Sequence, residues 1–187
     1  MKKYILIILT QVVFSQVSQN DFIFAKEFSK EISLYKSKKF VIDSIFGVTK
    51  SVVNFEIDAL AATSSGELTS LVYNCDTLNK KGLLLGFYGN YLNESGVLYQ
   101  GFGFKNLSVE KALQLLNKID QVKSNYNRYL SIEENSNNVY FYFEDITFLI
   151  YKTNLETKIR VFWKTFDAEW QEVAFNRTKV RFEKNLK

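Results

Sequence analysis

The sequence predicts an α+β domain in which helices pack against a mostly antiparallel sheet of about seven strands, in two layers. Three observations predict this class. Apolar residues recur at helical spacing in some segments and alternate with polar residues, as in strands, in others. Aromatic residues make up 16% of the chain and proline is absent, which favours extended strands. No repeated strand-helix-strand pattern occurs, so we do not expect a parallel sheet.

The first twenty residues have the pattern of a removable export signal. A basic pair at 2–3 precedes an apolar stretch over 4–14, which is about half as long as a membrane-spanning helix requires. We expect cleavage after Ser15 or, alternatively, after Ser18, and export to a periplasmic or extracellular location without a stable membrane anchor. A buried N-terminal helix or strand is the alternative. The predicted organisation is therefore a signal peptide over 1–15 and a single α+β domain over 16–187.

The first half of the domain is expected to form an amphipathic helix followed by four strands. Apolar residues three and four positions apart, from Phe22 to Tyr35, predict the helix. From Val53 to Ala59 the apolar spacing changes to two, which predicts a strand with one solvent-facing side. A turn over 63–66 then indicates an antiparallel hairpin. The expected ranges are 21–38 for the helix and 53–59, 67–75, 83–89 and 97–104 for the strands.

The second half is expected to form a helix, three strands and a last helix. Ser108 can cap a helix whose apolar residues run from Val109 to Val122, and Glu110 favours the positive end of its dipole. In the final segment, acidic residues such as Asp167 and Glu169 come early and basic residues come late. This order suits a helix dipole and predicts a C-terminal helix. The expected loop covers 131–138, and the strands lie in 139–152, with a turn at 144–145, and in 159–163.

Composition excludes several classes of function. The formal net charge of +4 falls to +2 when the two lysines of the signal are removed, which gives no support for nucleic-acid binding. The chain has no histidine, which excludes Ser-His-Asp and Cys-His catalysis and conventional histidine-ligated zinc. We expect no metal and no cofactor. The single cysteine, Cys75, cannot form an intramolecular disulfide, so we expect a small buried residue at a strand end, with a Cys75-linked dimer as the alternative.

Glu56 and Asp58 are the best candidates for catalytic acids. Two residues apart on a strand, they share a face and lie about 7 Å apart along it. Paired carboxylates of this kind can hydrolyse glycosides when one is protonated and the other ionised. A solvated strand face is the more common reason for such a pair.

Glycine and aromatic residues indicate a binding surface instead. Glycine inside a strand allows close approach of another group, which is either an aromatic side chain of a neighbouring strand or a ligand. Aromatic residues occupy both faces of the later strands. If helices cover one face only, the other presents tyrosines to an apolar ligand, a sugar or a partner protein, whereas a sheet covered on both faces presents nothing. The predicted surface consists of Gly101, Gly103, Tyr140, Tyr142, Tyr151 and Trp163.

Three functions follow from these patterns. The first is an exported, non-enzymatic module that binds a partner or an apolar ligand through a curved aromatic sheet, which requires a cavity or a contiguous apolar patch. The second is a small secreted hydrolase, glycosidase-like, in which Glu56 and Asp58 face a concave pocket and one carboxyl is desolvated. The third is a purely structural envelope protein, which requires neither feature.

Overall fold

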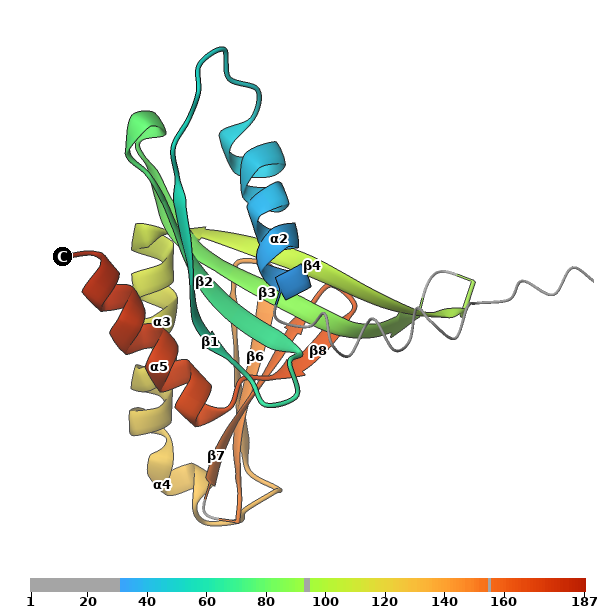
Figure 1. The fold of residues 1–187 in the computed structure, drawn as a ribbon. Coiled ribbons are helices and arrows are strands. Elements are labelled where there is room, and N and C mark those ends of the chain that lie inside the picture. The colour runs from blue at the N-terminus through green and yellow to red at the C-terminus, as the bar shows by residue number, and fades with distance from the viewer. Residues whose placement is uncertain (1–30, 93–94, 155) are drawn as a thin grey trace, which may run out of the picture.

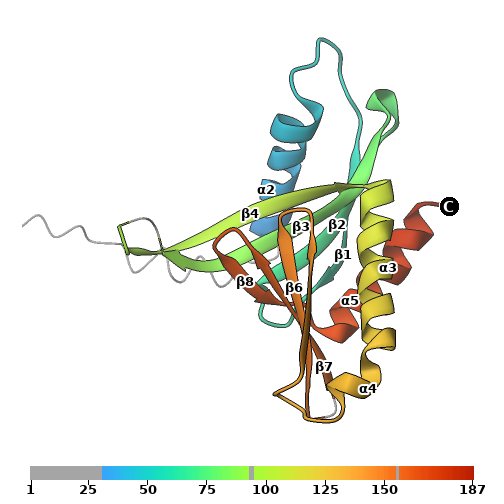
Figure 2. The ribbon, with the colours of Figure 1, turned by 180° about the vertical axis from the view of Figure 1, so that it is seen from behind.

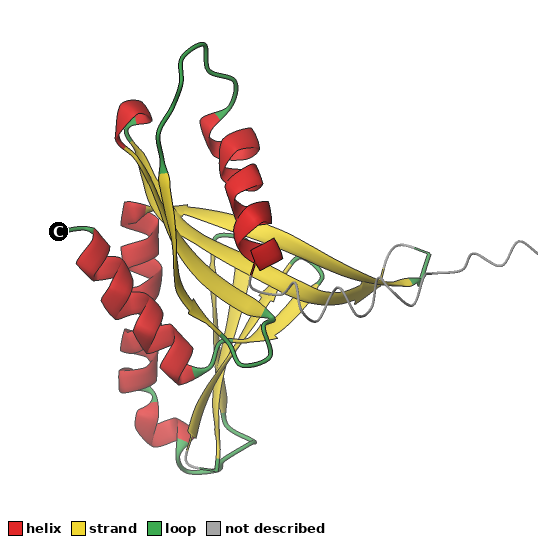
Figure 3. Cartoon of the chain, in the orientation of Figure 1, coloured by secondary structure: helices red, strands yellow, loops and turns green. Residues whose placement is uncertain are grey.

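The structure is a computed structural model that describes residues 31–92, 95–154 and 156–187. Its strands form two antiparallel sheets of four strands each, which we call sheet A and sheet B (Figures 1 and 3). In each sheet, strands that follow one another in the chain are neighbours. Sheet A contains β1 (Glu56–Ala62), β2 (Leu68–Cys75), β3 (Lys80–Leu92) and β4 (Leu98–Ser108). Sheet B contains β5 (Asn138–Phe143), β6 (Ile146–Thr153), β7 (Glu156–Trp163) and β8 (Phe166–Glu169).

Two longer helices follow the two sheets in the chain, so each half has the order of four strands and then a helix. Ser108 caps the first of them, because its hydroxyl accepts a hydrogen bond from the backbone N–H of Lys111. Within the described residues no helix is both long and apolar enough to cross a membrane. The helices are α2 (Glu31–Phe40), which continues as the π-helical segment η1 (Val41–Phe46), a short 3-10 turn η2 (Asp76–Leu78), α3 (Val109–Asn125), α4 (Asn127–Leu130) and α5 (Glu172–Asn185).

Sheet A is covered on both faces. Val41 of η1 packs with Leu71 and Leu84 on one face, and the other face, with Leu83 and Leu85, belongs to the main core. Figure 2 shows the same arrangement from behind, with α2 on one side of the sheet and sheet B, α3 and α5 on the other. The continuous apolar run of β3 suits this position, because a strand buried on both sides has no solvent-facing register.

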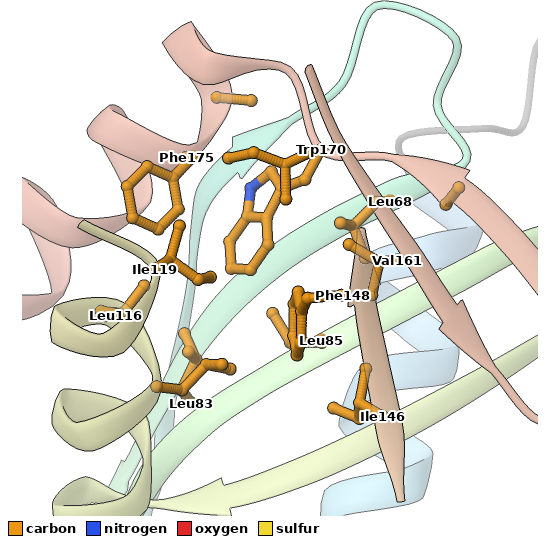
Figure 4. Packing of buried hydrophobic residues seen from close by; sticks show 14 of the residues in the cluster. Leu68, Leu83, Leu85, Leu116, Ile119, Ile146, Phe148, Val161, Trp170 and Phe175 are labelled. Carbon is orange, nitrogen blue, oxygen red and sulfur yellow. The ribbon is translucent and has the colours of Figure 1, made fainter. Parts of the chain in front are cut away.

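The main core lies where sheet A, sheet B, α3 and α5 meet (Figure 4). Trp170 and Phe175, whose ring centroids are 5.4 Å apart, lie next to each other in it. Its larger fully buried side chains include Leu60, Leu68, Leu83, Leu85, Phe87, Leu107, Leu115, Phe148, Trp170, Phe175 and Phe182.

Sheet B is packed on one face only by the described residues. Ile146, Phe148 and Ile150 of β6 are fully buried, and the residues between them are half-buried. Along β5, exposed residues alternate strictly with half-buried ones. Such alternation is typical of an antiparallel sheet with one face on the core and one toward solvent.

The predicted α+β class and antiparallel pairing are confirmed, but the strands number eight and form two sheets rather than one. The helix predicted over 21–38 is seen from Glu31 onward, and its earlier part lies outside the described residues, as do the predicted signal peptide and its cleavage sites. The helix predicted after Ser108 is confirmed as α3.

The extra strand is β8, where the sequence predicted the start of the C-terminal helix. Asp167 and Glu169 alternate with the buried residues Phe166 and Ala168, so the spacing is that of a strand. The helix α5 begins only at Glu172. The prediction for Asp167 and Glu169 was wrong because acids before a helix and acids on a strand face have the same charge pattern over so short a segment.

Candidate binding surface

The side of sheet B that points away from the core is the best candidate for a functional site, and we call it the outer face. Residues directly opposite each other in neighbouring strands share a face, so the register groups its members into rows, of which the last is Thr153 and Glu156 and the others follow. The other three rows are Asn138, Tyr151 and Lys158; Tyr140, Leu149, Arg160 and Glu169; and Tyr142, Thr147, Phe162 and Asp167.

The half of the outer face on β5 and β6 is aromatic and uncharged. Tyr140 and Tyr142 are 65% and 68% exposed, and their ring centroids lie 5.8 Å apart with the ring planes at 88°. Leu149 and Tyr151 of β6 lie beside them and are half-buried. These side chains form a contiguous apolar patch with phenol hydroxyl groups, which suits contact with another molecule.

The half on β7 and β8 is charged, but its charges are paired within the chain. A guanidinium nitrogen of Arg160 lies 2.6 Å from a carboxylate oxygen of Asp167, and this hydrogen bond raises the pKa of Arg160. The ammonium group of Lys158 lies 2.8 Å from Glu156 and 3.6 Å from Glu169. The outer face therefore has an aromatic half and a polar half of balanced charge.

Neither of the two best-defined depressions in the described part of the chain borders the outer face. One, of about 200 Å³, lies beside η1 and is lined by Ile42, Phe46, Gly47, Thr49, Val53 and Phe55. The other, of about 90 Å³, includes Glu56 and Asp58 and is described next. The outer face thus contributes no residue to either of these depressions.

Glu56 and Asp58 lie on β1 near the C-terminal end of α5, and both are exposed. The depression that they line is small, about 90 Å³, and its other residues include Asn74, Lys81 and Asn185. A protonated catalytic carboxyl at neutral pH needs a desolvated site. The exposed position of these two acids does not supply one, so we do not build a function on them.

The predicted surface residues are divided between the outer face and the core. Tyr140, Tyr142 and Tyr151 lie on the outer face. Trp163 is only 4% exposed and belongs to the core. A Cβ atom added to Gly103 would lie 2.8 Å from Trp163 and 3.0 Å from Phe166, so aromatic side chains of sheet B approach this glycine.

Gly101 is paired with Gly89 of β3, away from the outer face. Leu149 and Phe162 were not predicted as surface residues. Each lies between two buried residues of its strand, and this alternation indicates that it is on the opposite, outward face. Cys75 is 1% exposed at the end of β2, which gives no support for a disulfide between chains.

An ion-pair network joins the β5–β6 turn to sheet A and α3. The ammonium group of Lys105 lies 2.7 Å from Glu144 and 2.5 Å from Asp145, and Lys111 also binds Glu144. The indole N–H of Trp163 donates a hydrogen bond to Asp145 at 2.9 Å. Hydrogen bonds from Lys105 and Lys111 lower the pKa of Glu144, and the hydrogen bond from Lys105 lowers that of Asp145. This arrangement links the two sheets and gives both Glu144 and Asp145 a cationic partner.

The network makes stability depend on pH in a definite direction. Because the folded-state pKa values of Glu144 and Asp145 are below their ordinary values of 4.5 and 3.8, their contribution is full above pH 5 and is lost as the pH falls through the folded-state values. We expect Glu144→Gln to lower the free energy of unfolding by about 1 kcal/mol at pH 6, since it weakens two partly exposed ion pairs. Denaturant unfolding at pH 6 and pH 3 measures this difference, which should shrink at pH 3.

The matched control is Glu156→Gln. Hydrogen bonding to Lys158 lowers the pKa of this acid too, but the carboxyl is fully exposed. We expect a smaller effect than for Glu144→Gln at pH 6. Equal effects of the two substitutions would contradict a stabilising role of the network.

Within the described residues, no group of three or more histidine, cysteine, aspartate or glutamate side chains could hold a metal ion. No family model, no curated protein and no solved structure matches this chain. The candidate surface therefore has to be interpreted from its own geometry.

Proposed function

We propose that this chain is a non-enzymatic binding module that docks a partner protein on the outer face of sheet B. The observation that carries the proposal is the contiguous patch of Tyr140, Tyr142, Leu149 and Tyr151, which no described part of the chain covers. Two tyrosines more than 60% exposed lie next to each other on this sheet face, and contiguous apolar patches of this kind mark protein interaction sites.

The shape of the outer face favours a protein over a small molecule. Small ligands bind in concave cavities that surround most of their surface, and the two best-defined depressions of the described chain lie elsewhere. An aromatic centre beside a polar margin is the usual composition of a protein interface.

The tyrosines are expected to supply most of the binding energy. Tyrosine is common among the few interface residues whose truncation costs about 2 kcal/mol or more, which corresponds to a loss of roughly 30-fold in affinity. The charged half contributes less, because Arg160 and Lys158 already have partners in this chain.

Site-specific photo-crosslinking in the host cell tests this proposal. A benzophenone amino acid in place of Tyr151 is expected to give one discrete adduct of higher mass than the chain. The same amino acid in place of Tyr35, which is 73% exposed on α2, is the control and should give none. Adding Tyr142→Ala should reduce the adduct from position 151 by about tenfold, since it removes one interface anchor.

Each outcome of the crosslinking has a definite meaning. A heterologous adduct from position 151 that Tyr142→Ala removes supports the proposal. The absence of an adduct, or equal adducts from positions 35 and 151, would overturn it. An adduct whose mass equals two copies of the chain would overturn the proposal of a different partner protein.

We also propose that the chain is exported. The support is the sequence pattern of residues 1–15, with a basic pair followed by a short apolar stretch. The intact mass of the chain recovered from its host tests this. Cleavage after Ser15 or Ser18 supports export, and a mass that still includes residues 1–15 contradicts it.

A further inference from the structure

The loop between η1 and β1, residues 47–55, carries the two most exposed large hydrophobic side chains of the described residues. Val48 and Val52 are 105% and 91% exposed, and every residue from 47 to 52 is exposed. Figures 1 and 2 show this loop at one end of the molecule and α4 at the other. The two valines therefore lie in water at a tip that no described residue covers.

The base of the loop is held in place, although its tip is bare. Phe46 and Phe55, at the two ends of the loop, pack edge to face with their ring centroids 5.2 Å apart. The ring of Phe46 also lies 6.3 Å from that of Tyr73 in β2. The ammonium group of Lys80, at the start of β3, donates a hydrogen bond to the backbone oxygen of Ile45. Contacts with sheet A therefore fix where the tip projects.

Apolar groups continue below the tip. The depression beside η1, described above, includes Ile42, Val53 and the two phenylalanines of the loop base, and Ile42 is 45% exposed. Within the loop, the hydroxyl group of Thr49 donates a hydrogen bond of 3.0 Å to the backbone oxygen of Ser51. Because this bond partners two polar groups of the tip, it lowers the cost of removing the tip from water.

The segment that ends in this loop is basic. Residues 36–55 contain four lysines and one acid, a net charge of +3, and Lys50 between the two valines is the only charged residue from 44 to 55. The acid, Asp43, is paired with one of the lysines, Lys39, at 2.6 Å. At the strand ends of sheet A below the loop, two acids are balanced by two lysines. These are Glu56, Asp76, Lys80 and Lys81.

We infer that the loop over 47–55 docks this protein reversibly on an anionic lipid membrane. Val48 and Val52 enter the boundary between headgroups and acyl chains, and Lys50 lies among the headgroups. Apolar burial and attraction of basic residues to anionic lipid are the two contributions that together give such binding. The loop stays shallow, since its unpaired backbone groups are costly in the hydrocarbon interior. Contact of this depth is not a stable anchor.

The residue types at the tip favour a membrane over a protein as the occupant. Valine is uncommon among the residues that supply most of the energy of protein interfaces, where tryptophan, tyrosine and arginine dominate. A protein interface also requires a surface of matching shape. A fluid bilayer accepts a convex apolar tip without such a match, because the hydrophobic effect has no direction. The basic charge of the segment complements the anionic lipid.

The inference does not depend on the proposed function. The loop follows α2 and η1, which lie on the opposite side of sheet A from sheet B (Figure 2). Partner binding uses tyrosines of the outer face, whereas membrane docking uses valines and a lysine of the loop. A chain docked through the loop therefore leaves the outer face open to a partner protein.

Sedimentation with lipid vesicles tests the loop by a matched pair of double substitutions. The vesicles contain three parts phosphatidylcholine and one part phosphatidylglycerol, and the chain is used as recovered from its host. We expect Val48→Ser together with Val52→Ser to weaken binding at least about tenfold, because the apolar groups that enter the lipid are removed. Val173→Ser together with Val180→Ser, at positions of α5 that are 62% and 65% exposed, should leave binding unchanged.

The contribution of charge is measured separately with the same vesicles. Lys50→Gln should weaken binding about fivefold, the usual effect of one lysine close to an anionic surface. Lys50→Arg keeps the charge and should retain binding. With vesicles of phosphatidylcholine alone, wild type should bind more weakly and Lys50→Gln should bind no more weakly than wild type. Circular dichroism shows that all variants remain folded.

A dye in the loop shows which part of the chain enters the lipid. An environment-sensitive dye is attached to Val52→Cys or, as the control, to Ile132→Cys, which lies just after α4 and is 68% exposed in the wild type. Cys75 is 1% exposed and stays unlabelled. With anionic vesicles, we expect the emission to move to shorter wavelength at position 52 and to stay unchanged at position 132.

The outcomes separate a membrane from other occupants. A shift at position 52 together with a selective loss from the serine pair in the loop supports the inference. No binding to anionic vesicles, equal losses from the two serine pairs, or no shift at position 52 would each overturn it. A shift at position 52 in a membrane-free extract of the host, without one on vesicles, would also overturn it and assign the loop to a soluble partner.

Discussion

Replacement of Trp170 by alanine is expected to lower the free energy of unfolding by about 3–5 kcal/mol, as for other buried aromatic residues truncated to alanine. Trp170 is 1% exposed and is among the largest side chains of the core. Its indole ring packs edge-on against Phe175 at 5.4 Å, and its backbone N–H bonds to Ile159 of β7 at 2.7 Å. A loss of this size is a large share of the total stability of a typical domain, which is about 5–15 kcal/mol.

Denaturant unfolding monitored by circular dichroism measures this change. Tyr142→Ala is the matched control, because it also removes an aromatic ring, but from a side chain that is 68% exposed. We expect the control to change the free energy of unfolding by less than about 0.5 kcal/mol. If Trp170→Ala lowered the free energy of unfolding no more than the control does, this result would contradict the packing of α5 against the two sheets described above.

Gly103→Ala is expected to have the second-largest effect, with a loss of about 1–3 kcal/mol, the usual cost of overpacking a core. The added methyl group would lie 2.8 Å from a ring carbon of Trp163 and 3.0 Å from one of Phe166. Neither ring can move freely, since Trp163 is buried and also bonds to Asp145. The substitution therefore pushes sheet A away from sheet B.

Gly89→Ala is the control for this experiment. Gly89 lies in β3, and an added Cβ atom there meets no atom within 4 Å. We expect a change within about 0.5 kcal/mol in either direction, measured in the same unfolding experiment. Equal losses at the two positions would mean that a general preference against alanine, and not contact with Trp163 and Phe166, explains the glycine at 103.

The sequence alone was sufficient to predict those elements whose signals lie close together in the chain. Helix α3 was predicted from its apolar spacing and its serine cap, because both signals lie within a few residues of each other. The division into two sheets was not predicted, since alternation shows that a segment is a strand but not which strand it meets after an intervening helix. β8 was missed for a related reason. Its burial depends on contact with Phe87 of β3, about eighty residues earlier, which the local pattern does not show.

The candidate surface was predicted in part. Tyr140, Tyr142 and Tyr151 could be found because they are aromatic and alternate with other residues. Trp163 was assigned to the surface for its residue type, although it shares the period-two register of the buried residues Ile159 and Val161. Register was thus a better guide to exposure than residue type. The open side of sheet B required the structure, because only the placement of the helices shows which face they leave uncovered.

The hydrogen bond from Arg181 to the backbone oxygen of Leu60 has a consequence for how the chain reaches its fold. The two residues are 121 positions apart, and the buried hydroxyl groups of Ser70 and Thr178, which lie 2.6 Å from each other, are 108 apart. A ribosome must therefore make most of the chain before the first strand can acquire its final neighbours. Contacts between such distant segments carry a high entropic cost of closure and slow the folding of a domain. The apolar side of sheet A at β1 and β2 therefore stays uncovered in the newly made chain until α5 has been synthesised.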